Sequence, residues 1–132
     1  MQSFIVRGRR VLTPQGLRPA SVHIKDGRIT KVEAVDAVLP GANVLDAGDL
    51  LVTPGIVDSH VHINEPGRTE WEGFATATQA AAAGGVTTIV DMPLNSLPPT
   101  VDVAALDVKR TAAHGQCHVD VGFWGGAVPG NL

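Results

Sequence analysis

Residues 54–62 read PGIVDSHVH, a short apolar stretch that contains two histidines. The opening Pro-Gly pair interrupts regular structure, and the apolar residues after it predict a strand over residues 56–63. Residues two apart on a strand point to the same face, so His60 and His62 are expected side by side, with Asp58 on that face. Two neighbouring neutral imidazoles can bind one divalent metal ion.

The alternative interpretation is that these two histidines only form hydrogen bonds with main chain or water. Their position at the carboxyl end of an apolar strand favours metal binding, because α/β enzymes place their sites there. Two ligands do not complete a catalytic zinc site, which usually has three and an open position. The other histidines are interpreted as structural or surface residues: His23, His114 and His118.

A helix and a second strand are expected next. Thr69 and Glu72 have the spacing of a capping box, in which a hydroxyl and a carboxylate each bind an otherwise unpaired main-chain N–H. The alanine-rich segment that follows predicts a helix from Thr69 to Ala83, ended by Gly84-Gly85. Residues 86–91 are apolar and β-branched, which is typical of a buried strand.

A second helix and a third strand follow a proline-rich loop. Thr100 is the predicted N-cap of this helix, whose expected apolar face comprises Val101, Ala105, Val108 and Ala112. Residues 117–124 predict the third strand. This alternation of strands and helices indicates parallel strands with right-handed crossovers, as in a barrel or an open doubly wound sheet.

The residues before Pro54 have the pattern of short strands joined by turns. Residues 3–6 and 11–13 are two candidate strands. Alternating apolar positions on both sides of Asp26-Gly27 predict a hairpin over residues 20–34. Two further short strands, 44–45 and 50–53, complete a β-rich unit whose own core is expected to be marginal.

Composition excludes several classes of function. Of the 132 residues 44% are hydrophobic and 17% charged, so the chain can bury a core, and its net charge of −3 gives no nucleic-acid or anionic-membrane footprint. The one basic cluster, residues 7–10, is interpreted as a solvated turn. Cys117, the single cysteine, cannot form an internal disulfide and is interpreted as a core residue. No signal-peptide pattern or membrane-length apolar run is visible, so a cytoplasmic setting is expected.

The motif PGIVDSHVH resembles the opening motif of the amidohydrolase superfamily. Three longer strings are similar to those of one family of cyclic amidohydrolases, the allantoinases: NEPGRTEWEGF at 64–74, AGGVTT at 83–88 and DMPLNSLPPT at 91–100. The resemblance extends over essentially the whole chain, from the first strands to Gly125-Gly126.

This resemblance implies an α/β fold with a small β-sandwich and a barrel. Residues 1–53 would be the N-terminal part of the sandwich, and residues 54–132 the first three strands and two helices of a (β/α)8 TIM-type barrel. Because such a barrel needs eight strands and eight helices, the chain would be truncated.

The resemblance also implies a pair of divalent metal ions, zinc, in each complete site. His60 and His62 would bind one of them. A carboxylated lysine, two further histidines and a catalytic aspartate would come from later strands, so no catalytic residue is expected within this chain. Lys109 is not a candidate for the bridging lysine, because it does not follow a predicted strand.

The implied reaction is hydrolytic opening of a cyclic amide by water that the metal ions activate. The similar dihydroorotases carry arginine and asparagine at two positions where this chain has Asn64 and Leu94. Because arginine binds a substrate carboxylate and asparagine does not replace it, these differences favour allantoin, a neutral cyclic ureide. Asn64 and Asn95 are the candidate substrate-binding residues.

Other functions remain open on this reading. Within the same class they are dihydroorotase and hydantoinase or dihydropyrimidinase. Outside it, a short non-catalytic product could associate with a full-length relative through exposed strand edges. We expect the 132-residue chain itself to lack hydrolase activity. The full-length enzyme is expected to be a homo-oligomer that takes a cyclic ureide from purine degradation and binds neither nucleic acid nor membrane.

Overall fold

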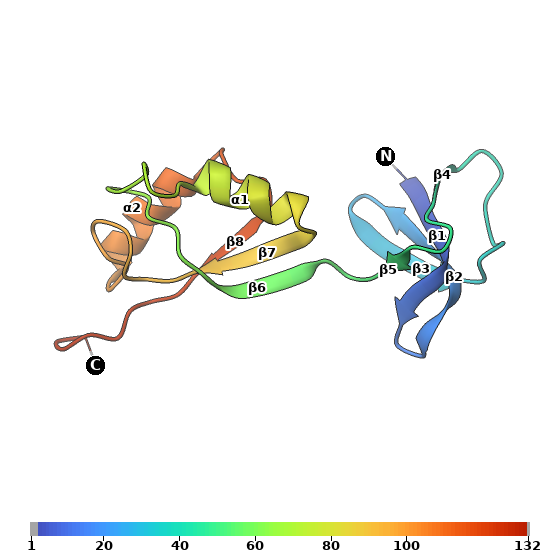
Figure 1. Cartoon of the computed structure of the whole chain (residues 1–132), viewed down its shortest axis with the longest axis horizontal. Helices are drawn as coiled ribbons and strands as arrows, with labels where there is room; N and C mark the ends of the chain where they lie inside the picture. Colours follow the sequence, from blue (N-terminus) through green and yellow to red (C-terminus); the bar gives the residue numbers. More distant parts are fainter. Residues whose placement is uncertain (1–2, 132) are drawn as a thin grey trace. The chain divides into compact units, whose positions relative to one another are not determined.

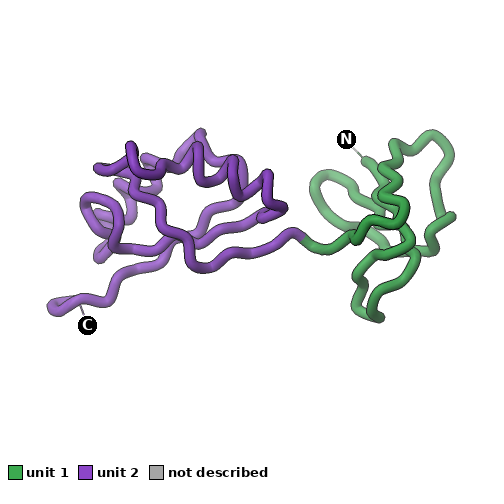
Figure 2. Tube along the Cα trace, viewed as in Figure 1, with its two compact units in different colours: residues 1–54 green, residues 55–132 purple. Residues whose placement is uncertain are grey.

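The computed structural model describes residues 3–131, which divide into two compact units at the Pro54–Gly55 bond (Figure 2). The first unit contains only strands. They are β1 (Ser3–Thr13), β2 (Gly16–Lys25), β3 (Arg28–Glu33), β4 (Asn43–Asp46) and β5 (Leu51–Val52).

The strands of the first unit form one sheet in the order β3-β2-β1-β4, with β5 also paired to β1 (Figure 1). The pairs β1–β2 and β2–β3 are antiparallel, whereas β4 and β5 run parallel to β1. The predicted hairpin at Asp26-Gly27 is confirmed. Both turn residues have positive φ, 51° and 75°, as a two-residue turn of this kind requires.

The first strand differs from the prediction, because residues 3–13 form one strand and not two. Its register against β2 shifts between Gly8 and Val11, so Arg9 and Arg10 lie in a bulge. Pairing with β2 resumes at Val11. The interpretation of residues 7–10 as a turn was therefore wrong. Arg7 forms an ion pair of 2.8 Å with Asp46, and Arg9 pairs with Asp49.

The core of the first unit is small. Val11, Ala20 and Val22 are buried together, and Ile24 and Val52 pack against them. Several large apolar side chains of this unit remain on its surface, among them Ile29, Leu39, Leu45 and Leu50. The expectation of a marginal core agrees with this arrangement.

The second unit alternates strands and helices. It contains β6 (Ile56–Val61), α1 (Phe74–Ala83), β7 (Val86–Asp91), α2 (Val103–Ala113) and β8 (Asp120–Phe123). The sheet order is β6-β7-β8, and both pairings are parallel, as the sequence predicts. Both helices lie on one face of this sheet (Figure 1).

One apolar cluster joins these helices to the sheet. Ile63, Phe74 of α1, Ile89 of β7 and Ala113 of α2 are buried together. Phe123 of β8 meets Phe74 edge to face at a centroid distance of 6.1 Å. The strand ends and the loops that follow them are therefore held against a packed layer.

The first helix begins five residues later than predicted, at Phe74. Its N-cap Gly73 contributes no side-chain bond, so the predicted capping box at Thr69 was wrong. The carboxylate comes from the preceding loop, where Glu65 Oε2 accepts from the Phe74 N–H at 2.9 Å. Glu72 accepts instead from the Thr76 hydroxyl.

The second helix is capped by Asp102, whose side chain accepts from the Ala105 N–H at 2.7 Å. Thr100 is buried and is not the cap, contrary to the prediction. The buried face is Ala105, Lys109 and Ala113, and Val108 on the predicted face is exposed. The prediction failed because it excluded a charged residue from the buried side. The last strand, β8, is shorter than the predicted 117–124.

Within the described residues, 3–131, neither helix combines the length and the apolar character needed to cross a membrane.

Candidate metal centre

His60 and His62 lie side by side at the carboxyl end of β6. Their ring centroids are 5.1 Å apart, with the ring planes inclined at 57°. Both side chains are exposed. Val61 between them packs against the apolar cluster under the helices, and Ile63 after them is part of that cluster. His60 and His62 are thus exposed, whereas Val61 and Ile63 pack into the core, as the predicted alternation requires.

Asn95, in the loop after β7, contacts the second of these histidines. Its Oδ1 lies 2.9 Å from His62 Nδ1. An amide oxygen only accepts, so Nδ1 is the donor in this contact, and Nε2 is the nitrogen through which the neutral ring could bind a metal. Metal-binding histidines are generally held in this way, with one ring nitrogen bonded to a protein acceptor and the other facing the metal.

These features fit a divalent metal ion as part of its ligand set. Two imidazoles with centroids at 5.1 Å are close enough to share an ion at the usual distance of about 2.0–2.1 Å. Across residues 3–131, however, no group of three or more His, Cys, Asp or Glu side chains could hold a metal. Within residues 3–131, His60 and His62 are therefore the two candidate ligands.

Asp58 does not join the two histidines as a third candidate ligand within residues 3–131. Its Oδ1 accepts from the main-chain N–H of His60 at 3.1 Å, so the carboxylate is engaged by its own strand. This contact fixes the main chain before the first histidine.

Asn64, the other candidate substrate residue, is buried in the loop after β6. Its main-chain N–H donates to the Glu72 main-chain carbonyl at 2.9 Å, and its own main-chain carbonyl accepts from the Arg68 main-chain N–H at 3.0 Å. Its Oδ1 is buried and has no hydrogen-bond partner within the described part of the chain. The structure joins Asn95 directly to His62, and within the described residues Asn64 has no hydrogen bond to either histidine side chain.

A buried ion pair lies behind this strand end, and the sequence interpretation missed it. Asp91, the last residue of β7, is 0% exposed and contacts Lys109 of α2, which is 1% exposed. Asp91 Oδ1 accepts from the Ile63 N–H at 2.8 Å, and Lys109 Nζ donates to the Met92 carbonyl at 3.2 Å. Two signals could have revealed the pair: an aspartate that ends an apolar strand, and a lysine between Ala105 and Ala113 at helical spacing.

Burial is the largest influence on the pKa of Asp91 and raises it above its ordinary value. The hydrogen bonds from Lys109 and from the Ile63 N–H oppose this shift, since they favour the carboxylate.

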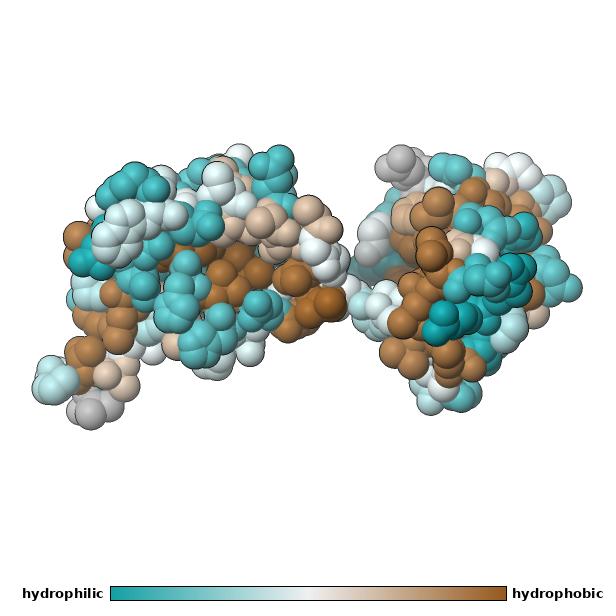
Figure 3. Space-filling view, viewed as in Figure 1, coloured by the Kyte–Doolittle hydropathy of each residue, from teal (hydrophilic) through white to brown (hydrophobic). Residues whose placement is uncertain are grey.

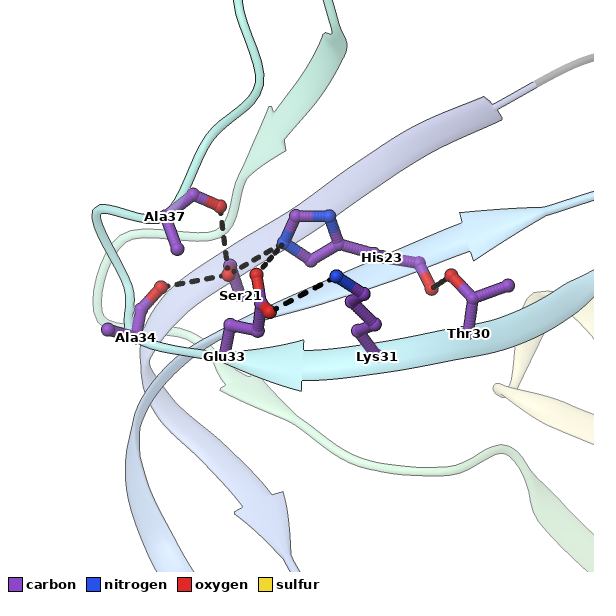
Figure 4. Close-up of polar contacts among 7 residues, drawn as sticks. All are labelled: Ser21, His23, Thr30, Lys31, Glu33, Ala34 and Ala37. Carbon is purple, nitrogen blue, oxygen red and sulfur yellow. Dashed lines mark hydrogen bonds and ion pairs between the residues drawn. The ribbon is translucent and has the colours of Figure 1, made fainter.

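A serine, a histidine and a glutamate meet in the first unit, but they do not form a nucleophilic triad (Figure 4). Ser21 Oγ and Glu33 Oε2 lie 3.2 and 3.6 Å from the same ring nitrogen of His23. Ser21 is fully buried, and its hydroxyl reaches the carbonyls of Ala34 and Ala37. The cluster ties β2 to the segment after β3, so the structural interpretation of His23 agrees with its contacts.

Cys117 fits the interpretation as a packing residue. It is partly buried against the apolar cluster, and its Sγ donates to the Ala113 carbonyl at 3.2 Å. Burial raises the pKa of its thiol, which lowers the fraction of reactive thiolate. His114 and His118 are both exposed.

Two proteins with similar sequences are named allantoinases. The allantoinase of Streptomyces avermitilis is 59% identical over 130 residues, which cover 98% of this chain and 29% of the relative. The mitochondrial allantoinase of Aquarana catesbeiana is 55% identical over 128 residues, covering 96% of this chain and 26% of the relative. This chain therefore spans less than a third of the length of these relatives.

Solved structures show the same arrangement of elements. The L-hydantoinase (dihydropyrimidinase) from Arthrobacter aurescens matches with a TM-score of 0.87 and 34% identity, over 99% of this chain and 29% of that one. A D-hydantoinase structure matches with a TM-score of 0.75 and 30% identity, over 92% of this chain and 26% of that one. The Amidohydrolase family model matches residues 51–131, which include both histidines, Asn95 and the buried ion pair. From this match over more than half its residues, the chain belongs to the amidohydrolase family.

Proposed function

We propose that this chain is the N-terminal, metal-binding portion of a hydrolase that opens the ring of allantoin to give allantoate. The observation that carries the proposal is the His60–His62 pair, with Asn95 bonded to His62 Nδ1, at the carboxyl end of a parallel strand. The identity of 59% to an allantoinase, over nearly the whole chain, supports the choice of substrate.

In this proposal residues 1–53 belong to a small β-sandwich domain, and residues 54–132 are the first βα units of a (β/α)8 barrel. Parallel strands with both helices on one face support the barrel. Apolar side chains are exposed on the second unit, including Ile56 at 57% and Val57 at 62% (Figure 3). Further barrel elements would cover such residues.

His60 and His62 would hold one of two zinc ions. When bound, the metal pair supplies Lewis-acid activation of water and of the ring carbonyl. The task of this chain is to present the two imidazoles as neutral ligands, and Asn95 fixes the ring of His62 for that purpose.

Two asparagines are proposed to contact the substrate. Asn95 uses its Oδ1 on His62, which leaves its amide hydrogens available as donors. Asn64 has a buried Oδ1 without a partner among the described residues, and a ureide N–H would provide one. Neither residue carries a charge, and Leu94 beside Asn95 is exposed, which suits a neutral ring better than a carboxylate.

Hydantoin hydrolysis is the second candidate, and the match to the L-hydantoinase structure favours it. This chain is 34% identical to that hydantoinase and 59% identical to the Streptomyces avermitilis allantoinase, so we propose allantoin ahead of hydantoin as the substrate.

The remaining proposals concern the complete enzyme, which we place in the cytoplasm as a homo-oligomer without nucleic-acid or membrane partners. The 132-residue chain alone would have no hydrolase activity, because two ligands cannot hold the metal pair. Its exposed apolar residues keep open the alternative of a non-catalytic product that associates with a full-length relative.

The test begins with the protein isolated from its source cells. Its intact mass is measured, and its zinc-loaded form is then assayed with allantoin, hydantoin and dihydroorotate. Ring opening of allantoin in preference to the other two supports the proposal. Turnover of dihydroorotate without allantoin would reject the substrate assignment, and a stable 13.7-kDa product that associates with a larger relative would favour the non-catalytic alternative.

A further inference from the structure

The segment that carries the two histidines does not follow a regular strand ladder. Asp58 is paired with Ile89 and Val61 with Asp91, so β6 has one residue more than β7 over this interval. A bulge of this kind interrupts pairing and re-aims side chains. The positions of the two imidazoles therefore depend on what holds residues 59–63.

Asp91 holds the end of this segment that follows the second histidine. Its Oδ1 accepts from the Ile63 N–H at 2.8 Å, and its other carboxylate oxygen contacts Lys109. Both charged side chains are almost completely buried, at 0% and 1% exposure. A buried ion pair is weak evidence for added stability, because desolvation of both charges offsets their attraction. Its contact with the main chain beside His62 indicates another purpose.

Trp124 holds the end of the segment that precedes the first histidine. Its indole Nε1–H donates to the Ser59 carbonyl at 2.9 Å, so the side chain reaches from the end of β8 past β7 to β6. Its own main-chain N–H donates to the Asp91 carbonyl at 3.0 Å. The side chain is 51% exposed, so burial of the ring does not by itself account for this position.

We propose that Asp91 and Trp124 are positioning residues that hold the bulged segment at both ends and so set the spacing of His60 and His62. One residue fixes the carbonyl before His60, and the other fixes the N–H after His62. Neither residue is proposed as a metal ligand. The proposal rests on the proposed function, in which these histidines are metal ligands.

The first test uses Trp124→Phe in the 132-residue chain, because this change keeps an aromatic ring and removes the N–H donor. Trp71→Phe is the matched control, since Trp71 is 68% exposed and its ring contacts Arg68. Proton NMR of the metal-free chain reports ring proximity through the cross-relaxation signal between the two imidazoles. We expect Trp124→Phe to lose most of this signal and Trp71→Phe to keep it.

The second test separates the hydrogen-bond acceptor of Asp91 from its charge. Asp91→Asn/Lys109→Met and Asp91→Leu/Lys109→Met both remove the buried charges, but only the first retains an oxygen that can accept from Ile63. We expect the asparagine variant to keep the imidazole signal and the leucine variant to lose it. If both variants lose it equally, or both keep it, the role assigned to Asp91 is wrong.

A Zn²⁺ titration followed through imidazole ¹⁵N chemical shifts then measures how the placement of His60 and His62 affects zinc affinity. Trp124→Phe is expected to weaken zinc binding about tenfold, as losses of outer-shell contacts do. An unchanged imidazole signal in Trp124→Phe would overturn the proposal regardless of zinc. Failure of the unsubstituted chain to bind zinc through the two histidines would instead count against the proposed function, since the metal-free signal still tests the positioning.

Discussion

His62 Nδ1 lies 2.9 Å from Asn95 Oδ1, and this contact joins the end of β6 to the loop after β7. Because this contact occupies Nδ1, Nε2 is the ring nitrogen that the proposed metal site would use. It also gives Asn95 a role that the resemblance to cyclic amidohydrolases did not supply, because that resemblance suggested only a substrate contact.

Removal of this contact is expected to weaken metal binding. Asn95→Ala leaves His62 free to rotate and to change tautomer, so the zinc affinity of the chain should fall about tenfold. The measurement is a Zn²⁺ titration followed through the imidazole signals. Leu94→Ala, at the exposed neighbouring position, is the control and should bind as the unsubstituted chain does. Equal affinities for the two variants would show that Asn95 does not support His62.

Lys109→Met should destabilise the second unit by about 3–5 kcal/mol, because it leaves the buried Asp91 carboxylate without its counter-charge. Adding Asp91→Asn to this variant should recover most of the loss, since no buried charge remains. Urea denaturation of both variants provides the comparison. If Lys109→Met alone is as stable as the unsubstituted chain, Asp91 and Lys109 do not form a buried ion pair.

The stability of Lys109→Met is expected to depend on pH in a definite direction. Burial raises the pKa of Asp91, and loss of Lys109 removes an opposing influence. A carboxyl with a raised pKa binds its proton more tightly in the folded state, so stability is greatest at acid pH and falls as pH rises above the ordinary value of 3.8. The stability deficit should therefore shrink as pH is lowered toward 4. A deficit that grows at acid pH would contradict this assignment.

Gly67→Ala should disturb the loop after the histidines. Gly67 has φ of 95°, and a Cβ there would lie 2.6 Å from the Leu97 Cβ. The backbone conformation costs about 1–2 kcal/mol for alanine, and the close contact adds about 1–3 kcal/mol. Gly85 has φ of 82° and open space around it, so Gly85→Ala should cost only the about 1–2 kcal/mol of the backbone conformation. Equal losses of stability in urea denaturation would show that Leu97 moves away freely.

Local patterns predicted most of the second unit. The parallel strands, the glycines after α1 and the neighbouring histidines all follow from period and spacing within a few residues. The Asp26-Gly27 hairpin was equally accessible, because the conformations of its two turn residues suffice to reverse the chain.

Features that depend on contacts between distant residues were not predictable in this way. The cap of α1 comes from Glu65, which reaches the helix from the preceding loop, so the local pattern at Thr69 was misleading. Lys109 lay outside the predicted apolar face, and its partner Asp91 comes from another element. Helical spacing places Lys109 in line with Ala105 and Ala113, but it does not identify the partner, which depends on how the strand ends and helices pack.

Allantoin hydrolysis by a chimera tests whether His60 and His62 are metal ligands of a cyclic amidohydrolase. In the chimera this chain replaces the aligned 130 residues of the Streptomyces avermitilis allantoinase. We predict zinc-dependent turnover that falls more than about 100-fold in His60→Asn and His62→Asn, beyond the usual effect of outer-shell changes, and is unchanged in the exposed control His118→Asn. Turnover that persists when both histidines are replaced would show that they are not required metal ligands.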